Sequence, residues 1–154
     1  MMAVAARFAA LLAGLWAGIL MCIAAIATPA VFATLPSADA GRVVARIFMQ
    51  EAYLSLGMAL VLFAIERQRS RADAVVGAGS VFGTNLILLL ATLFCTVAGY
   101  FAVQPMLAAA RAGQGSLSFM ALHAISLGFF ALKGLLVLAL AWRLTGVRPA
   151  ATTS

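Results

Sequence analysis

Residues 117–142, LSFMALHAISLGFFALKGLLVLALAW, decide the fold class of this chain. A helix that crosses a membrane needs about 20 predominantly apolar residues, and this longer stretch contains only one charged side chain, that of Lys133. Lipid offers no hydrogen bonds to open backbone groups, so a run of this kind is expected to be an α-helix. It also lacks the alternation of apolar and polar residues that a strand would show. The stretch therefore predicts a transmembrane helix.

Three further apolar runs of spanning length precede it, over residues 8–31, 43–65 and 81–103. The segments between the runs, residues 35–39, 66–73 and 104–115, are rich in charged or turn-favouring residues and are expected to be loops. Together the runs predict an all-α integral membrane four-helix bundle with antiparallel up-down topology. It would form a single membrane domain over residues 1–154, with a short tail at residues 143–154.

Composition indicates that lipid, not water, surrounds most of the chain. Charged residues make up 9% of the sequence and hydrophobic residues 66%, whereas soluble domains carry about 25% charged residues. The net charge of +6 does not indicate nucleic-acid binding, because the basic residues lie at the edges of apolar runs. The two cysteines, Cys22 and Cys95, form no C-x-x-C motif. We expect the lipid bilayer, and no nucleic acid, as a partner.

The distribution of arginine predicts the orientation. One side of the bundle would carry six arginines (Arg7, Arg67, Arg69, Arg71, Arg143 and Arg148) and the other three (Arg42, Arg46 and Arg111). The positive-inside rule then places both termini on the cytoplasmic side of a bacterial inner membrane. A cleaved signal peptide ending near residues 31–33 is an alternative, although the first apolar run is longer than the roughly 7–15 residues typical of such signals.

Ionisable side chains within the spans are costly and so mark candidate sites. Lys133 lies about ten residues, or roughly 15 Å, before the end of the fourth run, and Glu51 about eight residues, or roughly 12 Å, into the second. We therefore expect these two side chains to approach each other. Arg46, Gln50 and His123 would join them from the outer ends of their helices. Two interpretations remain open: a polar pocket for a small ligand or proton relay, or a structural network that holds the helices together.

Small residues recur at four-residue spacing and are candidates for close helix packing. The candidates are Gly14 and Gly18 in the first run, Gly79 and Gly83 at the start of the third helix, and Gly128 in the fourth. They would serve packing within the bundle or the seam of a homo-oligomer, and the sequence does not separate the two.

No catalytic motif and no cofactor are predicted. The chain has no P-loop, nucleotide-binding glycine pattern, H-E-x-x-H or nucleophile elbow. A copper or haem hypothesis would rest on His123 with Met49 and Met120, since thioether ligands suit Cu(I). These methionines show no clustered spacing, so no metal site is predicted from them.

Several short motifs resemble the bacterial transmembrane-protein-205-like family. They are residues 16–18 (WAG), 28–32 (TPAVF), 40–43 (AGRV), 47–48 (IF), Tyr53 and 122–126 (LHAIS). The resemblance implies a four-helix membrane domain and no particular activity. A more distant likeness runs to four-helix copper-resistance and protoporphyrinogen-oxidase-like membrane proteins, which tend to carry a functional histidine in the first helix; this chain has none there.

We therefore expect a non-enzymatic inner-membrane protein, either an accessory protein or a bundle that handles small solutes, alone or in a homo-oligomer or larger membrane complex. The alternative is a copper- or haem-handling membrane subunit.

Overall fold

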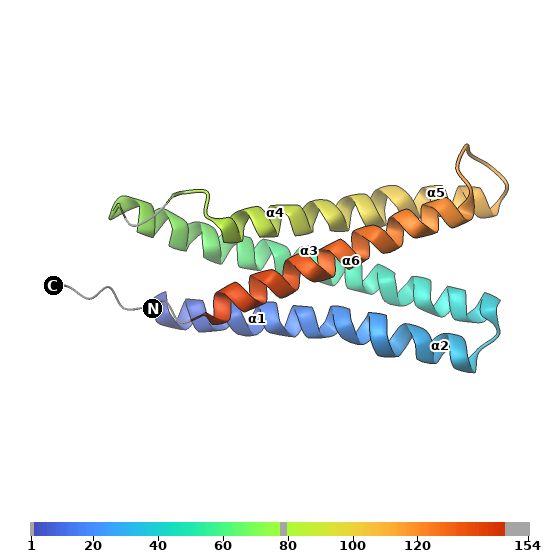
Figure 1. The fold of residues 1–154 in the computed structure, drawn as a ribbon, viewed down its shortest axis with the longest axis horizontal. Coiled ribbons are helices and arrows are strands. Elements are labelled where there is room, and N and C mark those ends of the chain that lie inside the picture. The colour runs from blue at the N-terminus through green and yellow to red at the C-terminus, as the bar shows by residue number, and fades with distance from the viewer. Residues whose placement is uncertain (1, 78–79, 147–154) are drawn as a thin grey trace.

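The computed structural model describes residues 2–77 and 80–146, which form four helical passes joined by short connections (Figure 1). In chain order the elements are α1 (Met2–Cys22), the π-helical η1 (Ile23–Ala27), α2 (Thr28–Thr34), α3 (Ser37–Val75), α4 (Thr84–Thr96), the π-helical η2 (Val97–Ala102), α5 (Val103–Arg111) and α6 (Phe119–Thr145). The passes run over Val4–Thr34, Ser37–Val75, Thr84–Arg111 and Phe119–Thr145, and each is long and apolar enough to cross a membrane. The prediction of an all-α protein with four such helices is confirmed.

Two of the three predicted loops are wrong, because the structure shows helix over all or most of each segment. Residues 66–73 continue α3 without a break, because the segment contains no glycine or proline and its Glu, Arg and Gln side chains favour helix. The chain turns only after Val75, where Gly77 adopts a φ of 71°. Residues 104–111 belong to α5, in which Pro105 sits in the first turn and breaks no hydrogen bond of that helix. The loop that follows begins at Ala112 and contains Gly113 with a φ of 72°.

The four passes form a closed ring of contacts. α1 packs against α3 and α6, and α4 packs against the same two helices. Figure 1 shows the α2–α3 and α5–α6 connections at one end of the molecule, which we call the connection end, and the start of α1 at the other. The main core includes Trp16, Leu20, Leu62, Leu89 and Leu140. This core joins α1, α3, α4 and α6, so all four passes are needed to bury it.

The π-helical segments mark where the bundle divides into two hairpins. The first two passes form one hairpin, and the last two form the other. A proline lacks an N–H group and clashes with the carbonyl four residues earlier. For Pro29 that carbonyl belongs to Ala25, within η1, and for Pro105 it belongs to Phe101, within η2. Beyond these segments α2 packs against α3, and α5 against α6. The two hairpins therefore separate toward the connection end, where α6 runs obliquely away from the first pass (Figure 1).

The predicted packing glycines do not mediate close helix contacts within the chain. A methyl group added at Gly14, Gly18 or Gly128 would meet nothing within 4 Å, and at Gly83 it would only reach the Ser70 hydroxyl at 3.5 Å. Gly79 lies outside the described residues. The reason is helical phase: α1 turns Ala9, Ala13, Trp16, Ala17 and Leu20 inward, which leaves Gly14 and Gly18 on the outer surface.

The close approach lies instead at Gly99 in η2. A Cβ atom there would come within 2.6 Å of the Cβ atom of Phe129 in α6. Gly99 also accepts a hydrogen bond of 3.4 Å from the Ser126 hydroxyl through its backbone carbonyl. The sequence analysis missed this glycine, because it stands alone and belongs to no small-residue stripe.

Candidate functional site: a cavity between the hairpins

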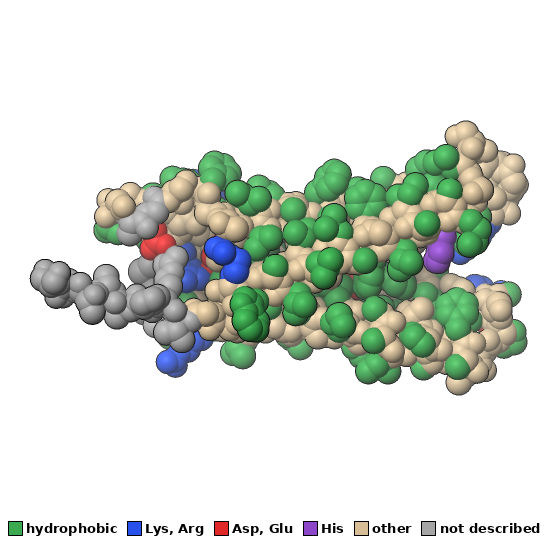
Figure 2. Space-filling model, in the orientation of Figure 1, with side chains coloured by type: hydrophobic (Ala, Val, Ile, Leu, Met, Phe, Trp, Pro, Cys, Tyr) green, Lys and Arg blue, Asp and Glu red, His purple; other side chains and the backbone are tan. Residues whose placement is uncertain are grey.

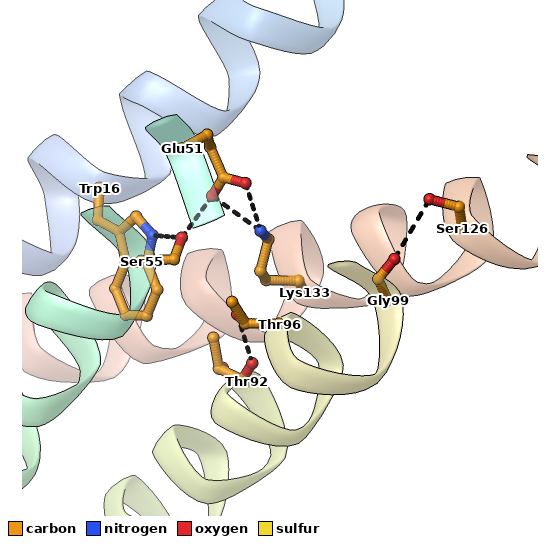
Figure 3. A network of polar contacts seen from close by, with 8 residues as sticks. All are labelled: Trp16, Glu51, Ser55, Thr92, Thr96, Gly99, Ser126 and Lys133. Atoms are coloured by element: carbon orange, nitrogen blue, oxygen red, sulfur yellow. Dashed lines mark hydrogen bonds and ion pairs between the residues drawn. The ribbon is translucent and has the colours of Figure 1, made fainter. Parts of the chain in front are cut away.

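A buried ion pair joins α3 to α6. The Nζ atom of Lys133 lies 2.8 and 2.7 Å from the two carboxylate oxygens of Glu51, and both residues are only 4% exposed. The Ser55 hydroxyl donates to the same carboxylate and accepts a 2.9 Å hydrogen bond from the Trp16 indole N–H. These contacts connect α1, α3 and α6 (Figure 3). The predicted approach of Lys133 to Glu51 is confirmed, and Trp16 proves to be a hydrogen-bond donor as well as a core residue.

The charged groups of Glu51 and Lys133 have hydrogen-bond partners although both are buried away from water. Both Glu51 oxygens accept from Lys133, and one also accepts from Ser55. The Lys133 ammonium lies 5.0 Å from the centroid of the Phe130 ring, an additional favourable contact for a cation. Such a network fixes the relative position of two helices, because a lone charge in the same place would be strongly destabilising.

The ion pair forms one wall of a cavity of about 850 Å³ between the two hairpins. Residues of α2 and α3 line one side, and residues of α4, η2, α5 and α6 line the other. Figure 2 shows a hollow between the two halves at the connection end, with the purple histidine beside it. Glu51 and Lys133 lie about fourteen residues into α3 and α6, which places them roughly 21 Å from the helix starts. The cavity thus reaches from the connection end to the middle of the bundle.

Basic and aromatic groups line the cavity near the connection end. Arg42 forms an ion pair with Asp39, although the arginine side chain remains 80% exposed. The guanidinium carbon of Arg111 lies 4.9 Å from the centroid of the Phe119 ring, and His123 stacks on the same ring with a centroid separation of 5.9 Å. Phe119 therefore contacts both Arg111 and His123.

Further polar side chains line the cavity without visible hydrogen bonds of their own. The Thr28 hydroxyl is shielded from solvent and has no hydrogen-bond partner among the described residues. Tyr100 and Gln104 also line the cavity, and neither side chain forms a hydrogen bond within residues 2–77 and 80–146. Buried polar groups in proteins are nearly always paired, so the Thr28 hydroxyl is a position where a bound molecule would supply the missing contact.

The structure brings together only part of the predicted polar layer. Glu51, His123 and Lys133 all line the cavity. Arg46 and Gln50 are exposed and lie outside the lining. The prediction that Arg46 and Gln50 belong to this layer was wrong, because they lie on a different face of α3 from the residues that line the cavity. The lining face of α3 includes positions 37, 38, 41, 42, 44, 45, 48 and 51. Arg42 therefore occupies the place in the lining that was expected for Arg46.

Only two of the three residues of the copper hypothesis line the cavity. Met120 and His123 line the cavity, but Met49 lies outside the lining, with its sulfur 3.9 Å from the Arg46 guanidinium. Over residues 2–77 and 80–146 no group of three or more His, Cys, Asp or Glu side chains gathers in a way that would hold a metal ion.

A second polar cluster lies at the opposite end of the bundle, and the sequence analysis missed it. The buried Glu66 forms an ion pair with Arg69 and accepts a 2.8 Å hydrogen bond from the Asn85 amide. The Asn85 side-chain oxygen in turn accepts a 3.0 Å hydrogen bond from Arg143. The cluster links α3, α4 and α6. The available signal was an acidic residue ending one apolar run and an asparagine near the start of the next.

A family model described as a domain of unknown function, DUF4149, matches residues 11–116. The chain belongs to the DUF4149 family. The match covers most of the first pass and all of the second and third, including Glu51 and the wall of the cavity formed by α3, and it ends before α6. No curated protein and no solved structure matches this DUF4149 chain.

The two hairpins of this DUF4149 protein carry the same sequence pattern. The pattern F-M-x5-S-L-G occurs at residues 48–57 of α3 and again at residues 119–128 of α6. Its serines have matching roles: Ser55 bonds to Trp16 in the preceding pass, and Ser126 bonds to Gly99 in the pass that precedes it. Each hairpin also has a proline after its π-helical segment. The cavity therefore lies between two units of similar construction.

Proposed function

We propose that this protein is a non-enzymatic bundle of the bacterial inner membrane that holds a small ligand between its two hairpins. The observation that carries the proposal is the cavity of about 850 Å³, which ends at the Glu51–Lys133 pair. Its volume falls in the range of about 300–1,000 Å³ that is common for small-molecule sites, and its lining combines apolar walls with a few polar groups. A purely structural bundle would have no need for a space of this size at membrane depth.

We propose further that the four passes cross the membrane in an antiparallel up-down arrangement with both termini in the cytoplasm. The excess of arginine near the start of α1, the end of α3 and the end of α6 supports this orientation. The cavity would then open toward the outer face. We also propose kinship with transmembrane-protein-205-like proteins within the broader family, on the basis of motifs such as TPAVF at residues 28–32.

The test is a comparison of what co-purifies with the protein and with two matched variants. Gly41 lines the cavity and Gly57 does not, both lie on α3, and a Cβ atom at either would meet nothing within 4 Å. Gly41→Trp should therefore fill the cavity, whereas Gly57→Trp should place the same side chain outside it. Mass spectrometry of organic extracts should find a ligand with the wild type and with Gly57→Trp, and a strongly reduced amount with Gly41→Trp. Identical extracts from all three proteins would overturn the proposal.

A further inference from the structure

We infer that the cavity takes a single-chain amphiphile with an anionic, oxygen-bearing headgroup, which would sit among the side chains of Arg42, Arg111 and His123. This inference rests on the proposed function, because it names the chemical class of the ligand for the same cavity. The apolar walls of the cavity, its balance of charge and its unpaired polar side chains support this ligand class.

The body of the cavity suits an alkyl chain. Its walls include Phe32, Val44, Leu107 and Leu127, which offer no polar side-chain groups. Burial of such surface against a chain is favourable in proportion to the apolar area removed from water. The cavity volume suits one chain of this kind.

Aromatic rings line the cavity near its inner end. Phe48 and Phe130 make an edge-to-face contact with ring centroids 4.9 Å apart. Each lies one helical turn nearer the connection end than Glu51 or Lys133, on the same helix. A chain that enters from the connection end would therefore meet phenyl rings before it reached the ion pair.

The charge balance of the lining selects an anion. Among the described residues the only lining carboxylate is that of Glu51, and Lys133 already neutralises it. Arg42 and Arg111 remain, and only Arg42 has an acidic partner within residues 2–77 and 80–146. A guanidinium binds carboxylate and phosphate oxygens through parallel N–H donors. The part of the cavity near the connection end thus carries positive charge that a cationic or neutral headgroup would not use.

Each of the unpaired polar side chains that line the cavity can donate a hydrogen bond. The Thr28 hydroxyl has no partner in the described chain, and the Gln104 amide and Tyr100 hydroxyl face the same space. A carboxylate or phosphate presents several acceptor sites and no donor. An anionic headgroup would therefore complement both the charge and the hydrogen-bonding capacity of this part of the cavity.

The experiment measures binding of four single-chain ligands that have the same number of carbon atoms but differ in the headgroup. They are hexadecanoate, hexadecyl phosphate, hexadecanol and hexadecylammonium. The full-length protein is placed in nanodiscs, and binding to the Gly41→Trp variant supplies the baseline for partitioning into lipid. We expect one or both anions to bind at least about tenfold more tightly than the alcohol and the ammonium ligand, a difference of about 1.4 kcal/mol. Preference for one anion would identify the headgroup as carboxylate or phosphate, and either result supports the inference.

Two arginine variants make the test specific. Arg111→Gln should weaken binding of the preferred anion about tenfold and leave hexadecanol unchanged. Arg46→Gln, which removes an exposed arginine outside the cavity lining, should bind like the wild type. Equal binding of all four ligands, with no effect of Arg111→Gln, would overturn the anion preference while the proposed ligand cavity stood. If no ligand bound above the Gly41→Trp baseline and no ligand co-purified, both proposals would fall.

Discussion

At the scale of single residues, the Glu51–Lys133 pair shows how a membrane bundle accommodates charge. Each group is buried and each depends on the other for neutralisation. Lys133→Leu leaves the Glu51 carboxylate without its counter-ion, and breaking a buried pair in this way costs about 3–5 kcal/mol. We expect a large fall in the midpoint of thermal unfolding in detergent for this variant.

The double variant Lys133→Leu with Glu51→Gln should recover part of that loss. The glutamine carries no charge and can still accept the hydrogen bond from Ser55, so the remaining cost is that of a neutral polar group. The midpoint of the double variant should lie clearly above that of Lys133→Leu. If the two variants unfold at the same temperature, the charge pairing contributes nothing to stability.

Asn85 acts as the link between two charged side chains at the opposite end of the bundle. Asn85→Leu should leave one Glu66 oxygen and the Arg143 Nε atom without their partner, because Asn85 bonds to both. A hydrogen bond to a charged group contributes about 1.5–3 kcal/mol, and because Arg143 is exposed we expect a total loss near the lower figure. Equilibrium unfolding in detergent measures the change. Thr84→Ala, at the exposed neighbouring position, is the control and should have little effect.

At the scale of the helical elements, the contact between η2 and α6 depends on the absence of a side chain at Gly99. Gly99→Ala should force η2 away from Phe129, because the new Cβ atom would lie only 2.6 Å from the Phe129 Cβ. Overpacking of this kind costs about 1–3 kcal/mol, and thermal unfolding should detect it. Gly128→Ala on α6 meets open space and should be neutral or slightly stabilising. Similar stability of the two variants would show that the helices do not approach closely at Gly99.

At the scale of the whole molecule, the proposed orientation has a direct test. A green fluorescent protein fused after residue 154 should fluoresce, because it would fold in the cytoplasm, whereas alkaline phosphatase at the same place should be inactive. Alkaline phosphatase inserted in the α5–α6 connection, after Gln114, should be active because that connection would lie outside. The reverse pattern of activities would contradict the orientation drawn from the arginine distribution.

The small-residue stripe on α1 bears on the proposed homo-oligomer. Gly14 and Gly18 are exposed on the outer surface, with nothing within 4 Å of an added Cβ atom. Gly14→Leu with Gly18→Leu should therefore leave the fold of one chain intact. If α1 forms a seam between copies, the double variant should shift crosslinked species in native membranes from oligomer to monomer. An oligomer unaffected by the substitutions would exclude this stripe as the seam.

The sequence by itself determined that the chain is helical and has four passes, because apolar runs of spanning length leave the backbone no other state in lipid. It also placed Lys133 and Glu51 at similar depth, since helical rise converts residue counts into distance. It did not reveal the full lengths of α3 and α5, because charged residues that favour helix are compatible with both a loop and a helix extending beyond the apolar run.

Only the tertiary structure decided which faces of the helices turn inward. It exchanged Arg42 for Arg46 in the cavity lining, turned Gly14 and Gly18 outward, and brought Gly99 against α6. These outcomes depend on the rotation of each helix about its own axis, and a helix that is apolar on every side carries little periodicity from which that rotation can be read. The cavity also depends on the tertiary arrangement, because it lies where the two hairpins separate toward the connection end.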